Sequence, residues 1–440
     1  MDTHITASEG SAVLARRPLH VIVVGGSLGG LMVGFLLTKQ GHNVRILEQA
    51  ISSERSGLAA GIGFSAFVQK FYEGELGLKG DDIGVYNSHF EVLDKNTLEC
   101  NYKIMKPMRL TSWDAAYYQV RAKIDGLASS YVPNPDAIKL EGEFRYETGK
   151  KVLKVEDVNG KMSAVVEDLS TGATENYRGD IIIAADGANS AIRRQLYPEL
   201  VREEPGYVIW RGTVRASELP QSTRDRVEGR AVIYVSDYNY AVMYTIPGDN
   251  GSLAPNDRHI NVAWYFWPSN PTIDEIMTDI DGHRHRTTVP KGKLRPEIWQ
   301  SQLLTAKDLL APEILELVKY IKVPFVSLIS SISAPKSAHF DNKLFLIGDA
   351  LTQSQPNVGM GTSLAAFAAF GLAEAIGKAG EEVKEERIKA WEKDTTAFVN
   401  VMRTRAVAFA SWYLNSWFKV AYYFGRWKLM EWWLGKKSPV

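Results

Sequence analysis

Three stretches of the chain are almost entirely apolar and end abruptly in glycine or a polar turn. The first is Leu19–Val24, and the other two lie within residues 180–187 (DIIIAADG) and 344–350 (LFLIGDA). Continuous apolar runs of this length are typical of parallel strands buried on both faces. The pattern therefore predicts a central parallel sheet whose strands come from distant parts of the sequence.

The first apolar run opens a βαβ unit. Residues 31–40 have helical spacing, Gly41 ends that helix, and residues 44–47 form a second buried strand. Further helices are predicted over residues 111–131, capped by Ser112 or Asp114, and over 303–320 and 363–379.

The pattern changes between Gly206 and Pro268, where four aromatic-rich segments are separated by turn residues. They read YVIWRGTV, RAVIYV, YAVMYTI and HINVAWYFW. Such segments predict an antiparallel sheet with one covered face. Residues 150–183 also alternate as strands, whereas residues 274–294 are polar and irregular.

The last aromatic-rich stretch, Phe409–Leu434, contains five of the 11 tryptophans. Lys419, Arg426, Lys428 and Glu431 interrupt it, so no apolar run reaches the roughly 18 residues of a membrane span. Two interpretations remain open. The stretch either packs over the protein or a partner subunit, or forms an interfacial helix in peripheral contact with a membrane.

Composition narrows the function classes. Lys+Arg and Asp+Glu both number 51 among 440 residues, which argues against a nucleic-acid partner. Cys100 is the single cysteine, so an internal disulfide is excluded and a reducing, cytoplasmic location is expected. His283 and His285 lack acidic or cysteine ligands at metal spacing, and we expect no metal site.

The turn after the first strand has the arrangement of a dinucleotide-binding motif. Gly25, Ser27 and Gly30 occupy the three positions of G-x-G-x-x-G, between a strand and a helix. The amides from Gly26 to Leu28 are expected to face a pyrophosphate at the helix N-terminus. Glu48, followed by Gln49, ends the second strand, where a carboxylate can accept hydrogen bonds from an adenosine ribose. NAD and FAD both fit this unit.

Two later motifs decide between them. Residues 180–196 (DIIIAADGANSAIRRQL) resemble the DG motif of flavoprotein monooxygenases, and residues 344–367 (LFLIGDALTQSQPNVGMGTSLAAF) resemble their GD motif. Over residues 19–400 the chain resembles the group A FAD-dependent aromatic hydroxylases of the para-hydroxybenzoate hydroxylase type, near 2,6-dihydroxypyridine hydroxylase and its fungal relatives. The sequence departs from the pattern at ALTQSQP, which lacks the usual His or Pro, and at Ser363, where Asn is common.

The resemblance assigns roles to individual residues. Asp349 would hold the ribityl chain, the amides of Gly361 and Thr362 would face the isoalloxazine, and Arg121 would reach the diphosphate. Asp186 would help both flavin and nicotinamide binding. The alternative for the two aspartates is that they only cap turns, and for Arg121 that it is a solvated helix residue.

The β-rich region supplies candidate catalytic residues for an aromatic pocket. These are Arg211, Tyr234, Tyr244 and Trp264, with Trp210, Tyr240, Tyr265 and His259 nearby. Arg211 could pair with a carboxylate or phenolate, and a tyrosine or His259 could relay the phenol proton. Because strand side chains alternate, only half of these residues can face a ligand.

The expected fold is α/β, with a Rossmann-like FAD-binding domain of the para-hydroxybenzoate hydroxylase (GR2) type, an inserted, mainly antiparallel substrate domain and C-terminal helices. Residues 1–18 are expected to be a disordered tail, 19–205 and 335–400 the FAD-binding domain, 206–334 the substrate domain, and 401–440 aromatic helices.

The resemblance implies that NADPH or NADH reduces FAD, that O2 forms a flavin C4a-hydroperoxide, and that a small electron-rich phenol or hydroxypyridine is hydroxylated. A homodimer is a further family-level expectation. Oxidative decarboxylation of a hydroxybenzoate-type acid by ipso hydroxylation, or epoxidation, remains an alternative. A non-catalytic flavin-fold binding protein is the alternative from another class.

Overall fold

The computed structural model describes all residues except 1–16, 53, 55–60, 414–416 and 435–440, so the predicted tail lies almost wholly outside the described residues. The apolar runs form a six-stranded sheet, in the order β20 (Ala338–His339), β21 (Leu344–Leu346), β12 (Ile181–Ala184), β1 (His20–Val24), β2 (Asn43–Leu47) and β8 (Phe144–Glu147). All neighbours are parallel except β20 and β21.

Both faces of this sheet are covered, as the apolar runs require. Alternate residues of β1 pack on α1 (Leu28–Lys39), α4 (Trp113–Asp125) and α11 (Gly361–Ile376). The other face packs on α12 (Glu385–Tyr413) and on a three-stranded sheet, in the order β11 (Thr174–Gly179), β10 (Lys161–Asp168) and β9 (Lys150–Val158).

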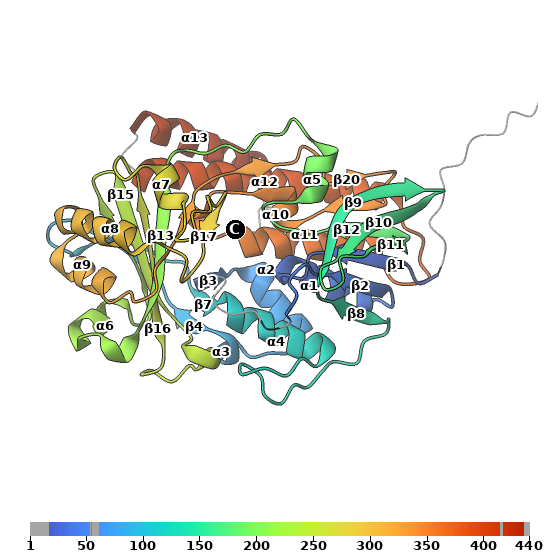
Figure 1. The fold of residues 1–440 in the computed structure, drawn as a ribbon, viewed down its shortest axis with the longest axis horizontal. Helices are drawn as coiled ribbons and strands as arrows, with labels where there is room; N and C mark the ends of the chain where they lie inside the picture. The colour runs from blue at the N-terminus through green and yellow to red at the C-terminus, as the bar shows by residue number, and fades with distance from the viewer. Residues whose placement is uncertain (1–16, 53, 55–60, 414–416, 435–440) are drawn as a thin grey trace, which may run out of the picture.

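A second, eight-stranded sheet forms the other half of the molecule (Figure 1). Its order is β17 (Thr288–Val289), β18 (Phe325–Leu328), β13 (Val208–Arg215), β16 (His259–Phe266), β15 (Asn239–Ile246), β14 (Ala231–Ser236), β5 (Phe90–Leu93) and β6 (Cys100–Ile104). One face packs on α7 (Ile273–Met277), α8 (Pro296–Leu309) and α9 (Pro312–Lys319), with α6 (Gln221–Val227) close by. The opposite face turns toward the six-stranded sheet.

The sequence predictions differ from the structure at four places, one of which is the predicted boundary at residue 400, because α12 runs across it. Strands β5 and β6 belong to the eight-stranded sheet although they lie outside residues 206–334, because β5 pairs in parallel with β14. The predicted helix 303–320 is two helices, since Pro312 begins a new one. The predicted helix 111–131 ends at Asp125, where Gly126 adopts a left-handed conformation with φ of 69°. Its cap is Ser112, which accepts a hydrogen bond from the amide of Ala115.

Apart from the last helix, the remaining elements are short. They are β3 (Gly61–Phe64), α2 (Ala66–Gln69), the π-helical η1 (Lys70–Glu75), α3 (Gly80–Ile83), β4 (Val85–Asn87), β7 (Met108–Ser112), α5 (Ala191–Leu196), η2 (Ala216–Glu218), η3 (Asp249–Gly251), β19 (Ile332–Ser333), α10 (Gly348–Leu351), β22 (Thr352–Gln353) and η4 (Pro356–Val358).

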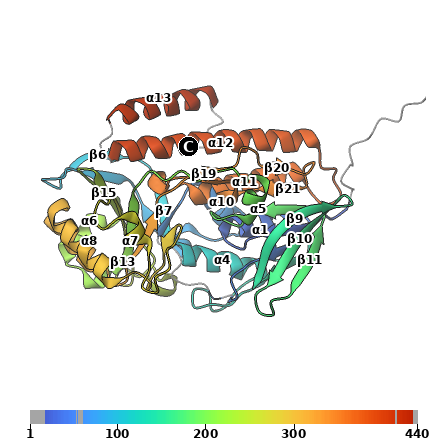
Figure 2. The ribbon, with the colours of Figure 1, turned by 45° about the horizontal axis from the view of Figure 1, so that its top comes forward.

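The chain ends in two antiparallel helices. Figure 2 shows α13 (Trp417–Leu434) lying along the outer side of α12, at the edge of the molecule. Within the described part of the chain, no helix is both long and apolar enough to cross a bilayer.

Candidate active site

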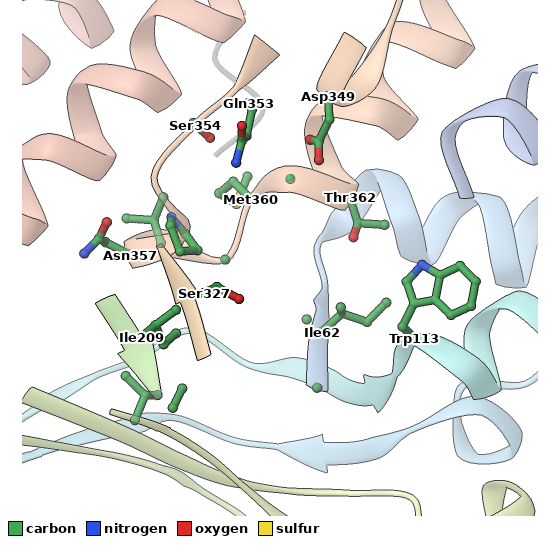
Figure 3. Close-up of a pocket in the computed structure, with 18 of the residues that line it drawn as sticks. Ile62, Trp113, Ile209, Ser327, Asp349, Gln353, Ser354, Asn357, Met360 and Thr362 are labelled. Atoms are coloured by element: carbon green, nitrogen blue, oxygen red, sulfur yellow. The ribbon is translucent and has the colours of Figure 1, made fainter. Parts of the chain in front are cut away.

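A cavity of about 540 Å³ lies between the two sheets. Three turns meet in its wall: Ser27–Gly29 after β1, Ala185 and Gly187 after β12, and Gly348–Asp349 after β21. The carboxyl ends of parallel strands lie at one edge of a sheet, which is where open α/β folds bind ligands. Asp349, Thr362 and Gln353 border the same space (Figure 3).

The first turn, at residues 25–30, has no room for a side chain at three of its glycines. Gly25 has a φ of 98°, and a Cβ there would overlap the carbonyl of Ala185 on the neighbouring turn. A Cβ on Gly26 would overlap the hydroxyl of Tyr146, and one on Gly30 would overlap the carbonyl of Gly25. The three glycines thus allow the turns to approach one another.

Glu48 stabilises this turn. Its carboxylate accepts hydrogen bonds from the amides of Gly26 and Ala50, each at 2.8 Å. The expectation that the amide of Gly26 faces a pyrophosphate is corrected here, because that amide is directed at Glu48. Ser27 and Leu28, at the N-terminus of α1, do line the cavity, whereas Gln49 is exposed and does not.

Arg121 is buried rather than solvated, and its guanidinium is occupied by protein groups. It pairs with Asp125 one turn along α4 at 2.8 Å, donates to the hydroxyl of Tyr117 at 2.6 Å, and stacks 3.6 Å from the ring centre of Tyr146. The Tyr146 hydroxyl donates to the carbonyl of Gly26 at 3.0 Å. Arg121 therefore supports the first turn through Tyr146. The sequence prediction did not include Tyr146, because the short strand β8 that carries it was not predicted.

Asp186 combines a structural contact with an unused oxygen. Its Oδ2 accepts a hydrogen bond from the amide of Ala191 at 2.8 Å and so caps α5. Its Oδ1 is buried and has no hydrogen-bond partner among the described residues. Burial raises the pKa of this carboxyl. The capping alternative is therefore realised, and Asp186 itself does not line the cavity, although its neighbours Ala185 and Gly187 do.

Asp349 faces the cavity from the turn after β21, opposite the N-terminus of α11 with Gly361 and Thr362. Enclosure by the protein raises its pKa to about 6, although Arg193 and Arg202 counteract that rise. Arg193 donates to the carbonyls of Asp349 and Ala350, both at 2.8 Å. This arginine of the DG motif therefore fixes the turn of the GD motif.

The unusual residues after the GD motif have a structural explanation. The hydroxyl of Tyr207 donates to Gln355 at 3.0 Å and to Asn357 at 3.1 Å, and the amide of Asn357 donates to the hydroxyl of Tyr240 at 2.7 Å. Tyr240 of the eight-stranded sheet and Tyr207, just before β13, thus hold this segment in place.

Strand alternation decides which candidate catalytic residues reach the cavity. Tyr234 and Trp264 lie on the opposite face, in the core shared with the covering helices, as does Trp210. Tyr234 accepts a hydrogen bond from the amide of Ala311 at 3.1 Å, and Trp264 donates to Asn239 at 3.1 Å. These side chains therefore do not reach the cavity and cannot contact a ligand there.

His259 does not reach the cavity either. Its Nε2 lies 3.7 Å from a carboxylate oxygen of Asp249, and the residue does not line the cavity.

Arg211, Tyr244 and Tyr265 do line the cavity. The hydroxyl of Tyr244 donates to the carbonyl of Gly61 at 2.9 Å, and burial raises its pKa to about 12. Tyr265 stacks on Tyr240, with ring centres 4.2 Å apart, and burial also raises its pKa. Both phenols therefore stay protonated near neutral pH.

Arg211 is a cation in the cavity wall that is a candidate for binding a ligand. Its Nε is buried and, among the described residues, has no hydrogen-bond partner. Its nearest ring contact is Phe325, at 5.8 Å from the guanidinium carbon to the ring centre. Because Arg211 lines the cavity and its Nε has no protein acceptor among the described residues, the position favours a negatively charged ligand that pairs with the guanidinium.

Two further cations in the cavity wall were missed. Lys106 lies between β6 and β7, and burial together with nearby Arg405 lowers its pKa to about 8. Arg405 comes from α12 and lies 5.1 Å from the ring centre of Trp427. Against these and Arg211, Asp349 is the one acidic residue in the described wall. Neither position carries a motif, so only the fold could reveal them.

The residues present fit a flavin dinucleotide. The glycine turns leave backbone exposed where three strands end, and the N-termini of α1 and α11 both border the cavity and favour negative groups. The cavity-facing Asp349 adds an acceptor for hydroxyl groups.

Comparison with known proteins supports this fit. Residues 205–331 match the sequence family described as FAD binding domain-like. The chain is 28% identical to 2,6-dihydroxypyridine 3-monooxygenase of Paenarthrobacter nicotinovorans, over 81% of this chain and 83% of that one. It is 24% identical to the FAD-dependent monooxygenase atnJ of Arthrinium sp, over 82% and 76% of the two chains.

Among solved structures, 2,6-dihydroxypyridine-3-hydroxylase from Arthrobacter nicotinovorans superposes with a TM-score of 0.75 at 23% identity, over 89% of this chain and 93% of that chain. This likeness confirms the predicted fold class.

Proposed function

We propose that this chain is an FAD-dependent monooxygenase that acts on aromatic rings, and that its cavity holds FAD beside a small, electron-rich and negatively charged aromatic substrate. The sequence relatives confirm the enzyme class and the FAD cofactor expected from the motifs. The substrate class rests on the charge of the cavity wall.

The residues at the three turns would hold the flavin. Ser27 and Leu28 would meet the pyrophosphate, Asp349 the ribityl hydroxyls, and the amides of Gly361 and Thr362 the pyrimidine edge of the ring. When bound, FAD supplies the transfer of one oxygen atom from O2 to the substrate, with electrons from NADPH or NADH. The protein contributes binding, orientation and exclusion of water.

Arg211 is the observation that carries the substrate class. Arg211 lines the cavity, its Nε has no hydrogen-bond partner within the described structure, and a carboxylate or phenolate in the cavity would pair with the guanidinium. Lys106 and Arg405 add positive charge to the same cavity. A cationic wall lowers the pKa of a bound phenol and so favours the phenolate, whose ring is the more electron-rich form.

Tyr244 and Tyr265 orient the ring rather than accept its proton. A phenol with a pKa near 12, such as Tyr244, is a poor base at neutral pH. The apolar side chains of Ile209, Ile233 and Val242 lie on the same sheet face and keep the reacting ring dry.

The test is a substrate screen with the purified yellow protein. Phenolic acids and hydroxypyridines, including 2,6-dihydroxypyridine because of the relative above, are each assayed for faster NADPH and NADH oxidation, and products are identified by mass. A product one oxygen heavier than an anionic substrate is expected. A colourless protein that refuses FAD, or a flavoprotein that no aromatic compound stimulates, would refute the proposal.

The same screen addresses ipso hydroxylation, which the cationic wall also supports because it can hold a carboxylate next to the reacting carbon. Loss of CO2 with gain of oxygen identifies that outcome. A cytoplasmic location, which the single exposed Cys100 supports, and a homodimer are further parts of the proposal. Light scattering of the purified protein tests the homodimer.

A further inference from the structure

The last helix presents an apolar stripe to solvent. Phe418, Tyr422, Leu429 and Trp432 are between 61% and 87% exposed. Together with Gly425 they are spaced four, three, four and three residues apart, so they fall on one side of α13. Large apolar side chains that share one exposed face mark an interaction surface.

The opposite side of α13 already has its partner. Phe424 and Trp427 pack on Phe409 of α12, with ring centres 5.4 and 5.8 Å apart, and the hydroxyl of Thr404 lies 3.6 Å from the sulfur of Met430. Figure 2 places α13 as the outermost layer above α12. The stripe therefore faces away from the protein.

Basic residues flank the stripe. Lys419 and Arg426 lie on one side and Lys428 on the other, all exposed. The carboxylate of Glu431 is turned inward, where it accepts from Trp427 at 2.8 Å and pairs with Lys428 at 3.1 Å. From residue 417 onward the sequence has five basic residues and one acidic residue, although the whole chain is neutral.

We propose that α13 docks this enzyme on an anionic lipid surface, with the stripe inserted among the acyl chains and the cations at the headgroups. Aromatic residues bordered by cations are the composition that such surfaces bind. A second copy of the chain is disfavoured, because a symmetric pairing of two stripes would bring the basic flanks together without acidic partners.

Docking would bring the membrane close to the cavity. Arg405 and Phe409, which line the cavity, are on the helix that carries α13, and both contact Trp427. One layer of side chains therefore separates the lipid-facing helix from the wall of the cavity.

The experiment is vesicle sedimentation with the full-length flavoprotein. We expect binding to phosphatidylcholine vesicles that contain phosphatidylserine, much weaker binding without phosphatidylserine, and release by salt. The triple substitution Phe418→Ser, Leu429→Ser, Trp432→Ser should reduce partitioning on the order of 100-fold. Lys419→Gln with Arg426→Gln should reduce it on the order of 10-fold.

A matched control variant tests whether vesicle binding depends on the stripe itself or on exposed apolar side chains in general. Val201→Ser, Ile280→Ser and Leu304→Ser remove three comparably exposed apolar side chains elsewhere and should leave partitioning unchanged. Circular dichroism and flavin content verify that each variant folds. If wild type stays in the supernatant, or the stripe variant binds as well as wild type, the proposal fails. It also fails if light scattering shows a dimer that the stripe variant dissociates, since a second copy then covers the stripe.

Discussion

The replacement Arg211→Met tests whether the cavity is built for an anion. The change removes the guanidinium and keeps a flexible apolar chain of similar length against Phe325. A hydrogen bond to a charged group contributes about 1.5 to 3 kcal/mol. Since each 1.4 kcal/mol is a factor of ten, the Kd of an anionic substrate should rise roughly 10- to 150-fold.

The stability of the Arg211→Met enzyme should respond differently from its affinity for the substrate. The buried Nε of Arg211 has no partner among the described residues, so its loss breaks no hydrogen bond of the free protein. The melting temperature of the substrate-free enzyme should therefore stay unchanged or rise slightly. A role in folding predicts the opposite, a clear fall in melting temperature with little change in Kd.

The assay is a titration of the flavin absorbance spectrum with the substrate identified in the screen and with an uncharged analogue of the same ring. Binding of the analogue should hardly change in the variant. Arg215→Met is the control, because Arg215 lies on the same strand but pairs with Asp249 outside the cavity. Equal weakening of the charged and uncharged ligands, or an unchanged Kd for the charged one, would refute the anion site.

Other predictions follow from single contacts. Gly26→Ala should abolish flavin binding and the yellow colour, because the new methyl group overlaps the Tyr146 hydroxyl. The control Gly74→Ala should retain the colour, because its Cβ meets only a flexible lysine at 3.9 Å. Flavin absorbance per protein measures both variants. For Lys106, with a pKa of about 8, the charge that attracts an anion is present below pH 8 and lost above it, so kcat/KM should fall above about pH 8. Lys106→Arg should move that fall to higher pH, and Lys106→Met should remove it; a wild-type profile that Lys106→Arg leaves in place would contradict the assignment. Trp264→Phe should lower stability by about 1 to 2 kcal/mol in urea and leave KM unchanged, because the indole donates to Asn239 on the covered face.

The sequence indicated the fold through the features that the backbone itself imposes. Buried parallel strands require continuous apolar runs, and close turns require glycine, so β1, β12, β21 and Gly25 were identifiable. The face of a strand could not be read, because aromatic residues occupy both sides of the eight-stranded sheet. Tyr265 and Trp264 are neighbours in the chain, and only packing shows which one borders the cavity.

Contacts between distant segments were also beyond the sequence. The parallel pairing of β5 with β14 joins residues more than a hundred positions apart, and no local pattern marks it. Lys106 and Arg405 lie in ordinary surroundings in the sequence and become a cationic wall only when β6, β7 and α12 meet. The turns that meet at the cavity and the candidate cation Arg211 were therefore readable from the sequence, whereas Lys106 and Arg405 were not.

The hydrogen bonds that join Tyr207 and Tyr240 to Gln355 and Asn357 have a consequence for evolution and redesign. Through these bonds the loop that borders the cavity at residues 353–359 is held by the eight-stranded sheet, whose other side chains line the same cavity. Remodelling that sheet to accept a larger molecule would displace the loop, so altered selectivity and weakened retention of the prosthetic group should arise together in laboratory-evolved variants.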